Sequence, residues 1–316
     1  MDLLYQMTPL ALGVATPIII CSLGGLFSER SGVVNIALEG IMLVGAFAGA
    51  TANIFLQDSL GSAAPWISII IGAFVGLLYS LIHAFASIHL KADQTISGTA
   101  LNMLSTGLTV YLCQIIFQAQ RSPNFTSSFS RINVPLFCDI PVIGKLFFTN
   151  VYPTFYIGLL LVVVTWFVVF KTKFGLHLRS CGEYPQASAS MGIDVIKMRY
   201  IGVLTSGFLG GLAGAIMVLS MEIQFTVFAI HGVGFIAMAC LIFGKWKPFG
   251  CLGAGLFFGF SQVLSLFSSQ IPIIGGFPSE LFYAIPYLLT IIALILFARK
   301  SVGPKASGEI YDSGKR

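Results

Sequence analysis

The stretch KTKFGLHLRSCGEYPQASASMGIDVIKMR, residues 171–199, lies between two long hydrophobic halves of the chain. Five of the seventeen Lys and Arg residues fall in it. Its middle, PQASASM at 185–191, starts with a proline and continues with small residues. That pattern is typical of a short helix that another body can approach closely. The stretch therefore predicts a polar segment that protrudes from a hydrophobic protein and contacts a partner.

The rest of the chain is too apolar for a protein that folds in water. Of its 316 residues 56% are hydrophobic and 9% are charged, against about 25% charged in soluble domains. Apolar runs of roughly 20 residues recur along the whole length, so we expect an all-α polytopic membrane protein. The alternation of period two that a membrane barrel needs is absent. We expect contact with the lipid bilayer and none with nucleic acid, because the net charge of +5 reports membrane topology.

About nine membrane spans, in a range of eight to ten, can be placed on these runs. The first residues, MDLLYQ, contain no Lys or Arg, so we expect the first run to be retained as a span. Lys and Arg concentrate on the cytoplasmic side of membrane proteins. An outside N-terminus and an inside C-terminus place fourteen of these residues inside and three outside. The predicted spans are 7–26, 34–55, 65–88, 95–117, 152–170, 200–221, 225–243, 248–267 and 281–298.

We interpret residues 1–316 as a single transmembrane domain. Its first half (7–117) and second half (200–298) each hold four spans, and the two sets run in opposite directions. Between them lie the central span and cytoplasmic loop (152–199), and a cytoplasmic tail (299–316) follows. This layout is the one expected of an inverted-topology repeat with a pathway near the middle of the membrane. The sequence similarity between the halves is weak, so the repeat rests on the orientation of the spans.

Several pairs of glycines are four residues apart, which places both members on one helix face and lets another backbone come close. We interpret these pairs as packing seams rather than substrate contacts. They are Gly45 and Gly49, Gly207 and Gly211, Gly210 and Gly214, and Gly255 and Gly259. The long external loop at 118–150 is expected to be functional or to pack over the mouth of the protein.

No catalytic motif stands out in the sequence. The patterns GxxxxGK[ST], HExxH, CxxC and GxSxG are all absent. The four histidines are too scattered for a recognisable metal site, and the six cysteines show no paired spacing. We therefore expect no enzyme activity, no catalytic residue, no metal site and no cofactor bound by this chain.

Polar residues inside the predicted spans are the candidates for a substrate pathway, because they are costly in hydrocarbon. Glu39 either lines such a pathway or interacts with the start of its own helix and with Arg30. The polar stretch ADQTISGTALNM at 92–103 is either a broken helix along an aqueous path or an interfacial helix start. Neutral hydroxyl and amide groups suit a polar uncharged substrate such as a sugar or nucleoside. The pathway candidates are Asn35, Glu39, Thr95, Ser97, Asn102 and His231.

Three stretches carry a resemblance to a known family: SERSGVVNIALEGIMLVGAF (28–47), FGLHLRSCGEYPQASASMGIDVIKMR (174–199) and GKWKPFG (244–250). They resemble the permease subunits of bacterial ABC importers in the branched-chain amino acid and simple-sugar superfamily, in the branch that takes up nucleosides. Sugar permeases of this superfamily typically have one more leading helix, which agrees with nine spans and an outside N-terminus.

The resemblance implies that residues 171–199 couple the permease to a separate cytoplasmic ATPase. The coupling residues it indicates are Arg179, Gly182, Glu183, Pro185, Ala187, Ala189 and Gly192. Ser180, Cys181, Tyr184 and Ser188 depart from the family pattern there.

The same resemblance implies several partners and a location. It implies ATP and Mg on the ATPase, a second and often different permease chain, and an extracytoplasmic lipid-anchored binding protein. It implies the plasma (inner) membrane of a bacterium, and nucleosides, purine nucleosides above all, as the cargo. The alternatives are a ribose, simple-sugar or branched-chain amino acid ABC permease and, more distantly, an ion-coupled secondary transporter. That last class usually carries more ionisable residues in its spans.

Overall fold

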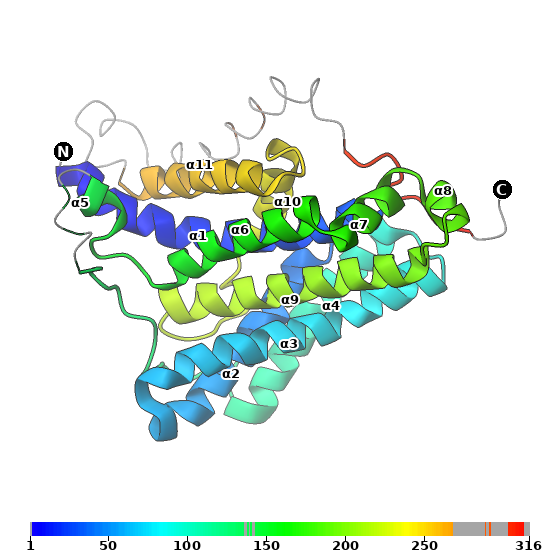
Figure 1. Ribbon diagram of the computed structural model, residues 1–316. Coiled ribbons are helices and arrows are strands. Elements are labelled where there is room, and N and C mark those ends of the chain that lie inside the picture. Colours follow the sequence, from blue (N-terminus) through cyan, green and yellow to red (C-terminus); the bar gives the residue numbers. More distant parts are fainter. Residues whose placement is uncertain are drawn as a thin grey trace.

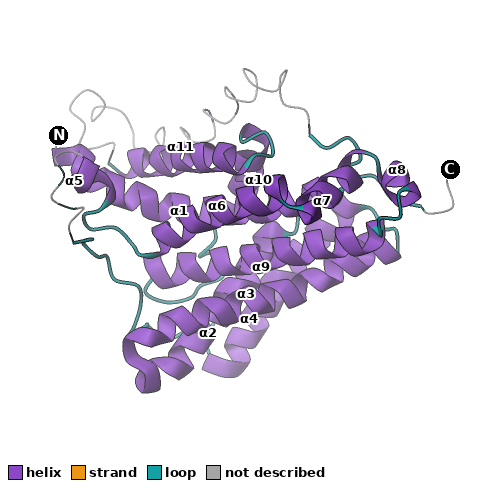
Figure 2. Ribbon diagram, viewed as in Figure 1, coloured by secondary structure: helices purple, strands orange, loops and turns teal. Residues whose placement is uncertain are grey.

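The computed structural model describes residues 2–135, 138, 140, 143–267, 288, 291 and 303–312. Within these residues the protein is all helical, and Figure 2 shows helices joined by loops with no strand. The helices are α1 (Asp2–Ser31), α2 (Leu38–Leu60), α3 (Ala64–Ala84), α4 (Gln94–Phe117), α5 (Ile143–Phe147), α6 (Thr154–Lys171), α7 (Lys173–Glu183), α8 (Pro185–Ser190), α9 (Val195–Met221), α10 (Val233–Phe243) and α11 (Pro248–Leu266).

Six stretches are long and apolar enough to cross a membrane by length and composition. One of them, Leu38–His89, contains both α2 and α3, which are joined by the short turn Gly61–Ala63. Eight helices fall on eight of the nine predicted spans, and the predicted span 281–298 lies outside the described residues, apart from 288 and 291.

The span predicted at 225–243 is wrong at its start, because α10 begins only at Val233. The backbone before it is not helical: His231 has φ 47° and Gly232 has φ 82°, both in the left-handed region. With 11 residues α10 is only about 16 Å long, at 1.5 Å per residue. It is therefore too short to cross a bilayer alone, and residues 222–232 lead into it as an irregular segment.

Helix α9 occupies the centre of the bundle and packs against α1, α2 and α3. Figure 1 shows it between α2, α3 and α4 on one side and α1, α6 and α11 on the other. Glycines make the close packing possible. A Cβ on Gly72 would come within 2.6 Å of the Gly45 carbonyl oxygen, and one on Gly76 within 2.6 Å of the Gly211 Cα. These contacts confirm that the glycine pairs of α2 and α9 are packing seams.

The glycine pair of α11 lets this helix pack closely on α1. A Cβ on Gly259 would lie 2.7 Å from the Cβ of Ala15, and one on Gly255 would overlap the side chain of Ile19. Since α1 also contacts α6, α7 and α10, it links most of the second half of the chain to α9.

The two ends of the bundle carry different features. In Figure 1 the N-terminus and α5 lie at one end, whereas α7, α8 and the tail 303–312 lie at the other. The predicted coupling segment and the C-terminal tail therefore share one face, as the charge pattern predicts, and the segment between α4 and α6 lies at the opposite end.

Candidate functional site: a coupling segment and a transport path

The chain is not helical between α1 and α2, and side chains from α3 and α4 satisfy its backbone. The amide of Val34 donates to Gln94 Oε1 at 2.7 Å. His83 Nε2 lies 3.1 Å from the carbonyl oxygen of Val34, and its Nδ1 lies 3.1 Å from Ser97 Oγ. Because a carbonyl oxygen only accepts, Nε2 donates there. Irregular backbone is tolerated in a membrane protein only with such internal partners.

Asn102 provides the cap that α2 lacks in its own sequence. The residue before α2 is Ala37, whose side chain cannot accept a hydrogen bond. Asn102 Oδ1 instead accepts from the amide of Gly40 at 2.8 Å, and its Nδ2 donates to the carbonyl oxygen of Ile36 at 2.9 Å. The polar start of α4 thus holds the beginning of α2 in place.

Two other pathway candidates lie in different surroundings. Asn35 is only 1% exposed, and its Nδ2 donates to Ser206 Oγ at 2.9 Å. Thr95 is exposed, and its amide donates to Asp93 Oδ1 at 2.8 Å in the cap of α4. The structure thus buries Asn35 between helices and leaves Thr95 at the surface.

Glu39 caps α10 rather than its own helix. Its two carboxylate oxygens accept from the amides of Gly232 and Gly234, each at 2.7 Å. A Cβ on Gly234 would lie 2.6 Å from the Glu39 Cα, so glycine is required for this approach. A negative charge at a helix N-terminus is favourable because the first amides have no partner within the helix. Neither reading of Glu39 drawn from the sequence included this contact with another helix.

His231 stands beside that cap with an exposed side chain. Its ring lies 6.4 Å, centroid to centroid, from the ring of Phe228, which is 73% exposed. Phe228 lies inside the predicted span 225–243, so its exposure on an irregular segment is not predicted from the sequence. The glycine after the histidine was the signal that the helix begins later.

The predicted coupling segment, 171–199, contains α7, α8 and the turn that leads into α9. Its boundaries follow local sequence: Thr172 Oγ1 accepts from the amide of Gly175 at the start of α7, Pro185 is the first residue of α8, and Asp194 caps α9. The exposed side of α8 and the turn after it is formed by Gln186, Ala187, Ser190, Met191 and Gly192, whereas Pro185 and Ser188 are buried and Ala189 is half-buried.

Helix α7 rests directly on the end of α1. A Cβ on Gly182 would overlap the carbonyl oxygen of Arg30, so only glycine allows this contact. Arg179 turns the other way: its guanidinium lies 5.0 Å from the ring of Phe170 on α6, and its Nε donates to the carbonyl oxygen of Gly175 at 3.3 Å. The coupling segment is therefore packed onto both α1 and α6.

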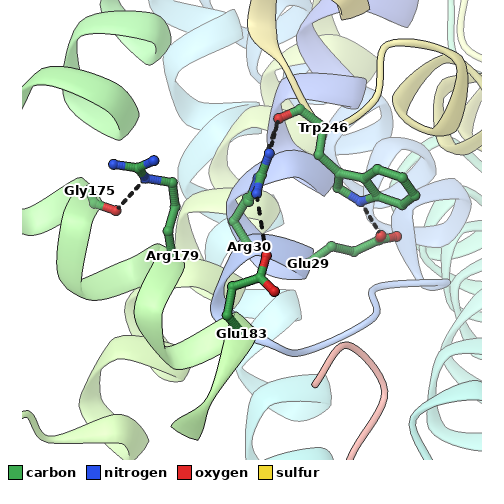
Figure 3. Close-up of polar contacts among 6 residues, drawn as sticks. All are labelled: Glu29, Arg30, Gly175, Arg179, Glu183 and Trp246. Carbon is green, nitrogen blue, oxygen red and sulfur yellow. Dashed lines mark hydrogen bonds and ion pairs between the residues drawn. The ribbon is translucent and has the colours of Figure 1, made fainter. Parts of the chain in front are cut away.

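Arg30 connects the coupling segment to the turn after α10 (Figure 3). Its Nη2 donates to the carbonyl oxygen of Trp246 at 2.9 Å, and its Nη1 lies 3.9 Å from Glu183 Oε1 on α7. The indole Nε1 of Trp246 in turn donates to Glu29 Oε2 at 2.5 Å. Arg30 thus joins α7 to the α10–α11 turn, and the neighbouring Glu29 holds the same turn through the Trp246 indole.

The comparisons with known proteins agree with this arrangement. Residues 8–294 match the family described as branched-chain amino acid transport system / permease component. The chain belongs to this family. It is a multi-pass membrane permease, a transport subunit, and the predicted resemblance is confirmed.

Two relatives are similar over nearly their whole length. The permease is 47% identical over 315 residues to the guanosine ABC transporter permease protein NupQ of Bacillus subtilis (strain 168), covering 100% of this chain and 99% of the relative. It is 45% identical over 301 residues to the nucleoside ABC transporter permease protein NupC of Lactococcus lactis subsp. cremoris (strain MG1363), covering 95% of each. A further match is the guanosine ABC transporter permease protein NupP of Bacillus subtilis (strain 168), at 26% over 288 residues, with 90% and 79% covered.

The tail of the permease lies across the same face as the coupling segment. The amide of Ala306 donates to the carbonyl oxygen of Gly182 at 2.9 Å, and Lys305 Nζ donates to the Tyr184 hydroxyl at 2.5 Å. The hydrogen bond that Lys305 donates to Tyr184 is the largest cause of the raised pKa of Lys305. The tail thus contacts the two residues that flank Glu183.

The tail also covers the start of α9. Arg199 is 1% exposed, and its Nη1 donates to the carbonyl oxygen of Glu309 at 2.8 Å. Its guanidinium lies 5.7 Å from the ring of Tyr311. Beside it, burial raises the pKa of the Cys181 thiol, so this cysteine stays protonated near neutral pH. Farther along, Asp312 pairs with Lys91 at 3.1 Å. Residues 303–312 therefore join the coupling segment to α9 and to the turn before α4.

Proposed function

We propose that this permease moves nucleosides, chiefly purine nucleosides, into the cell by alternating access, powered by ATP hydrolysis on a separate subunit. The names of NupQ and NupC support the cargo, since both relatives are permeases for guanosine or nucleosides and cover this chain almost completely. The single observation that carries the mechanism is α8, a short exposed helix that directly follows α7, which Arg30 joins to the turn after α10.

The ATPase would hold α8 in a cleft of its own surface. Ala187 and Ser190 are exposed on α8, and Met191 just after it is 82% exposed, so a partner can approach this helix without rearrangement. ATP and Mg would bind on that partner, and this chain would bind no cofactor. Movement of α8 would pull on α7, and the contacts of Arg30 with Glu183 and Trp246 would carry the displacement to α10.

A second permease chain would complete the membrane part of the importer. The names NupQ and NupP support a pair of different chains, because one organism holds two guanosine permeases that differ strongly in their similarity to this protein, 47% and 26%. An extracytoplasmic lipid-anchored binding protein would deliver the cargo at the opposite end, where the loop between α4 and α6 lies.

We also propose the orientation and the two halves predicted from charge: an outside N-terminus, a cytoplasmic tail in the plasma (inner) membrane of a bacterium, and halves at 7–117 and 200–298 that run in opposite directions. One parallel supports the halves. Both α2 and α10 start after an irregular segment, and each is capped by a side chain from another helix, Asn102 for α2 and Glu39 for α10.

Uptake of labelled guanosine into vesicles that contain the assembled importer tests this function. We expect ATP-dependent uptake that other nucleosides compete for, whereas ribose and leucine do not. The variant Ala187→Glu places a charge on the exposed face of α8 and should abolish uptake and binding of the ATPase while membrane insertion continues. Ser62→Glu, an exposed position in the turn just before α3, is the matched control and should keep both. Competition by leucine or ribose, or normal uptake with Ala187→Glu, would contradict the proposal.

A further inference from the structure

Two adjoining hollows lie where α4 ends and the irregular segment 222–232 begins. Their volumes are about 460 and 450 Å³, and both are lined by Ala119 and Arg121. Pockets for small molecules commonly measure about 300–1,000 Å³. Most of their lining residues follow the ends of α4 and α9, and these helix ends lie away from α8 in Figure 1, where a delivered cargo would arrive under the proposed function.

The second hollow has one aromatic wall and one hydroxyl-bearing wall. Thr226 and Phe228 lie in the turn closed by the hydrogen bond from the Ala229 amide to the Thr226 carbonyl oxygen, and both line this hollow, with Phe228 73% exposed. Thr106 and Val110, one turn apart on α4, line the other side. An exposed phenylalanine opposite a threonine is a combination suited to a flat ring that also carries hydrogen-bonding groups.

Backbone hydrogen bonds keep these walls in register. The amide of Ser122 donates to the carbonyl oxygen of Phe225 at 3.0 Å, and the amide of Phe225 donates to Ser122 Oγ at 2.8 Å. The amide of Phe125 donates to the carbonyl oxygen of Ile223 at 2.8 Å. Arg121 itself pairs with Thr226 in an isolated antiparallel bridge. The position of Arg121 is therefore set by the same backbone contacts that place Phe228.

Arg121 has a charge that the permease leaves available. Among the described residues its guanidinium makes no ion pair: the two pairs found join Arg30 to Glu183 and Lys91 to Asp312. A surface arginine often needs no partner. Here, however, the side chain lines both hollows beside an exposed aromatic ring, and guanidinium is the group that reads planar acceptors with two parallel hydrogen bonds.

We infer that these hollows form an entry site for the base of a 6-oxopurine nucleoside, an inference that rests on the proposed nucleoside function. Phe228 stacks on the purine, and Arg121 donates to the O6 and N7 acceptors of its edge. Arginine pairs in this bidentate way with guanine, whereas adenine presents an amino donor in place of O6. The site therefore favours guanosine and inosine over adenosine and cytidine, and the threonine hydroxyls face the sugar.

Uptake of four nucleosides by the complete importer, with variant and wild-type rates compared for each, tests this site. The binding protein is the same in every assay, so the ratio of variant to wild type isolates the contribution of the permease. With Arg121→Met we expect guanosine and inosine uptake to fall about tenfold or more, with adenosine and cytidine nearly unchanged. With Phe228→Leu we expect the uptake of all purine nucleosides to fall about fivefold or more. Phe228→Tyr should keep their uptake near the wild-type rate.

The outcomes separate this inference from the proposed function. If the wild-type importer does not take up nucleosides, the proposed function fails. If it does, but Arg121→Met lowers the uptake of all four nucleosides equally, or of none, the role of Arg121 in base recognition is overturned. Assembly with the ATPase and monodispersity in detergent show whether each variant is folded, and Arg121→Lys, which keeps the charge but not the fork, should lose the same selectivity. If vesicles rich in anionic lipid change wild-type uptake but not that of Arg121→Met, Arg121 binds a lipid headgroup and the inference is also overturned.

Discussion

The cap that Glu39 places on α10 leads to a prediction with a defined size. Alanine at this position removes both acceptors and leaves the amides of Gly232 and Gly234 without a partner. Hydrogen bonds to a charged group contribute about 1.5–3 kcal/mol each, so two of them amount to about 3 kcal/mol or more. Glutamine keeps one acceptor oxygen and should lose about half of that amount.

Hydrogen–deuterium exchange of residues 232–236 in the detergent-solubilised permease measures this change locally. Since about 1.4 kcal/mol corresponds to a factor of ten, we expect exchange there to rise about 100-fold or more with Glu39→Ala and about tenfold with Glu39→Gln. Glu183→Gln is the control, because the Glu183 side chain is 39% exposed and its ion pair with Arg30 is long, at 3.9 Å. If Glu39→Ala changes exchange at 232–236 no more than Glu183→Gln does, the carboxylate does not hold the start of α10.

Three further predictions concern the face that carries α8. Arg30→Met loses its contacts to α7 and to the turn after α10, and should lower ATP-driven uptake about tenfold. Glu183→Gln removes only the contact to α7, a half-exposed pair of about 0.2–1 kcal/mol, and should lower uptake by less. Unchanged uptake with Arg30→Met would contradict this connection. A thiol introduced by Ser190→Cys should react with an impermeant maleimide only in opened cells. A thiol introduced by Ser128→Cys should react in intact cells as well. The reverse pattern would overturn the proposed orientation. Deletion of 303–316 removes several hydrogen bonds to backbone groups and should destabilise the purified permease by about 2–3 kcal/mol. The change is measured as a lower unfolding midpoint. An unchanged midpoint would show that the tail adds nothing to stability.

Helix positions could be predicted well because apolar runs report burial in lipid directly. The runs at 95–117 and 200–221 correspond to α4 and α9 within a few residues. The failure at α10 has a physical cause: Phe225 to Ile230 are apolar apart from Thr226, yet Phe225 and Ile230 are buried by tertiary contacts without being helical. Hydropathy measures the tendency to avoid water, and it does not distinguish helix from irregular backbone packed inside protein.

The roles of polar residues were harder to predict, because each depends on a partner far away in the chain. Asn102 and Glu39 look like pathway residues when only their own spans are considered. Their partners, Gly40 for Asn102 and Gly232 and Gly234 for Glu39, are 62 to 195 positions away. The short helix at 185–191 was easier to predict, because a proline at a first helical position acts within its own turn.

The contacts at the two ends of α10 restrict how the permease can move. One end is held by Glu39 of α2, and the turn at the other end is held by Arg30 and Glu29 of α1. Because α2 is also joined to α9 through glycine contacts without intervening side chains, α1, α2, α9 and α10 are fixed to one another. Under the proposed mechanism a pull on α8 would therefore move these four helices together. The relative motion that opens and closes a path would then occur where contacts are fewer, against α4, whose side chains are mostly exposed and which touches this group through the start of α2.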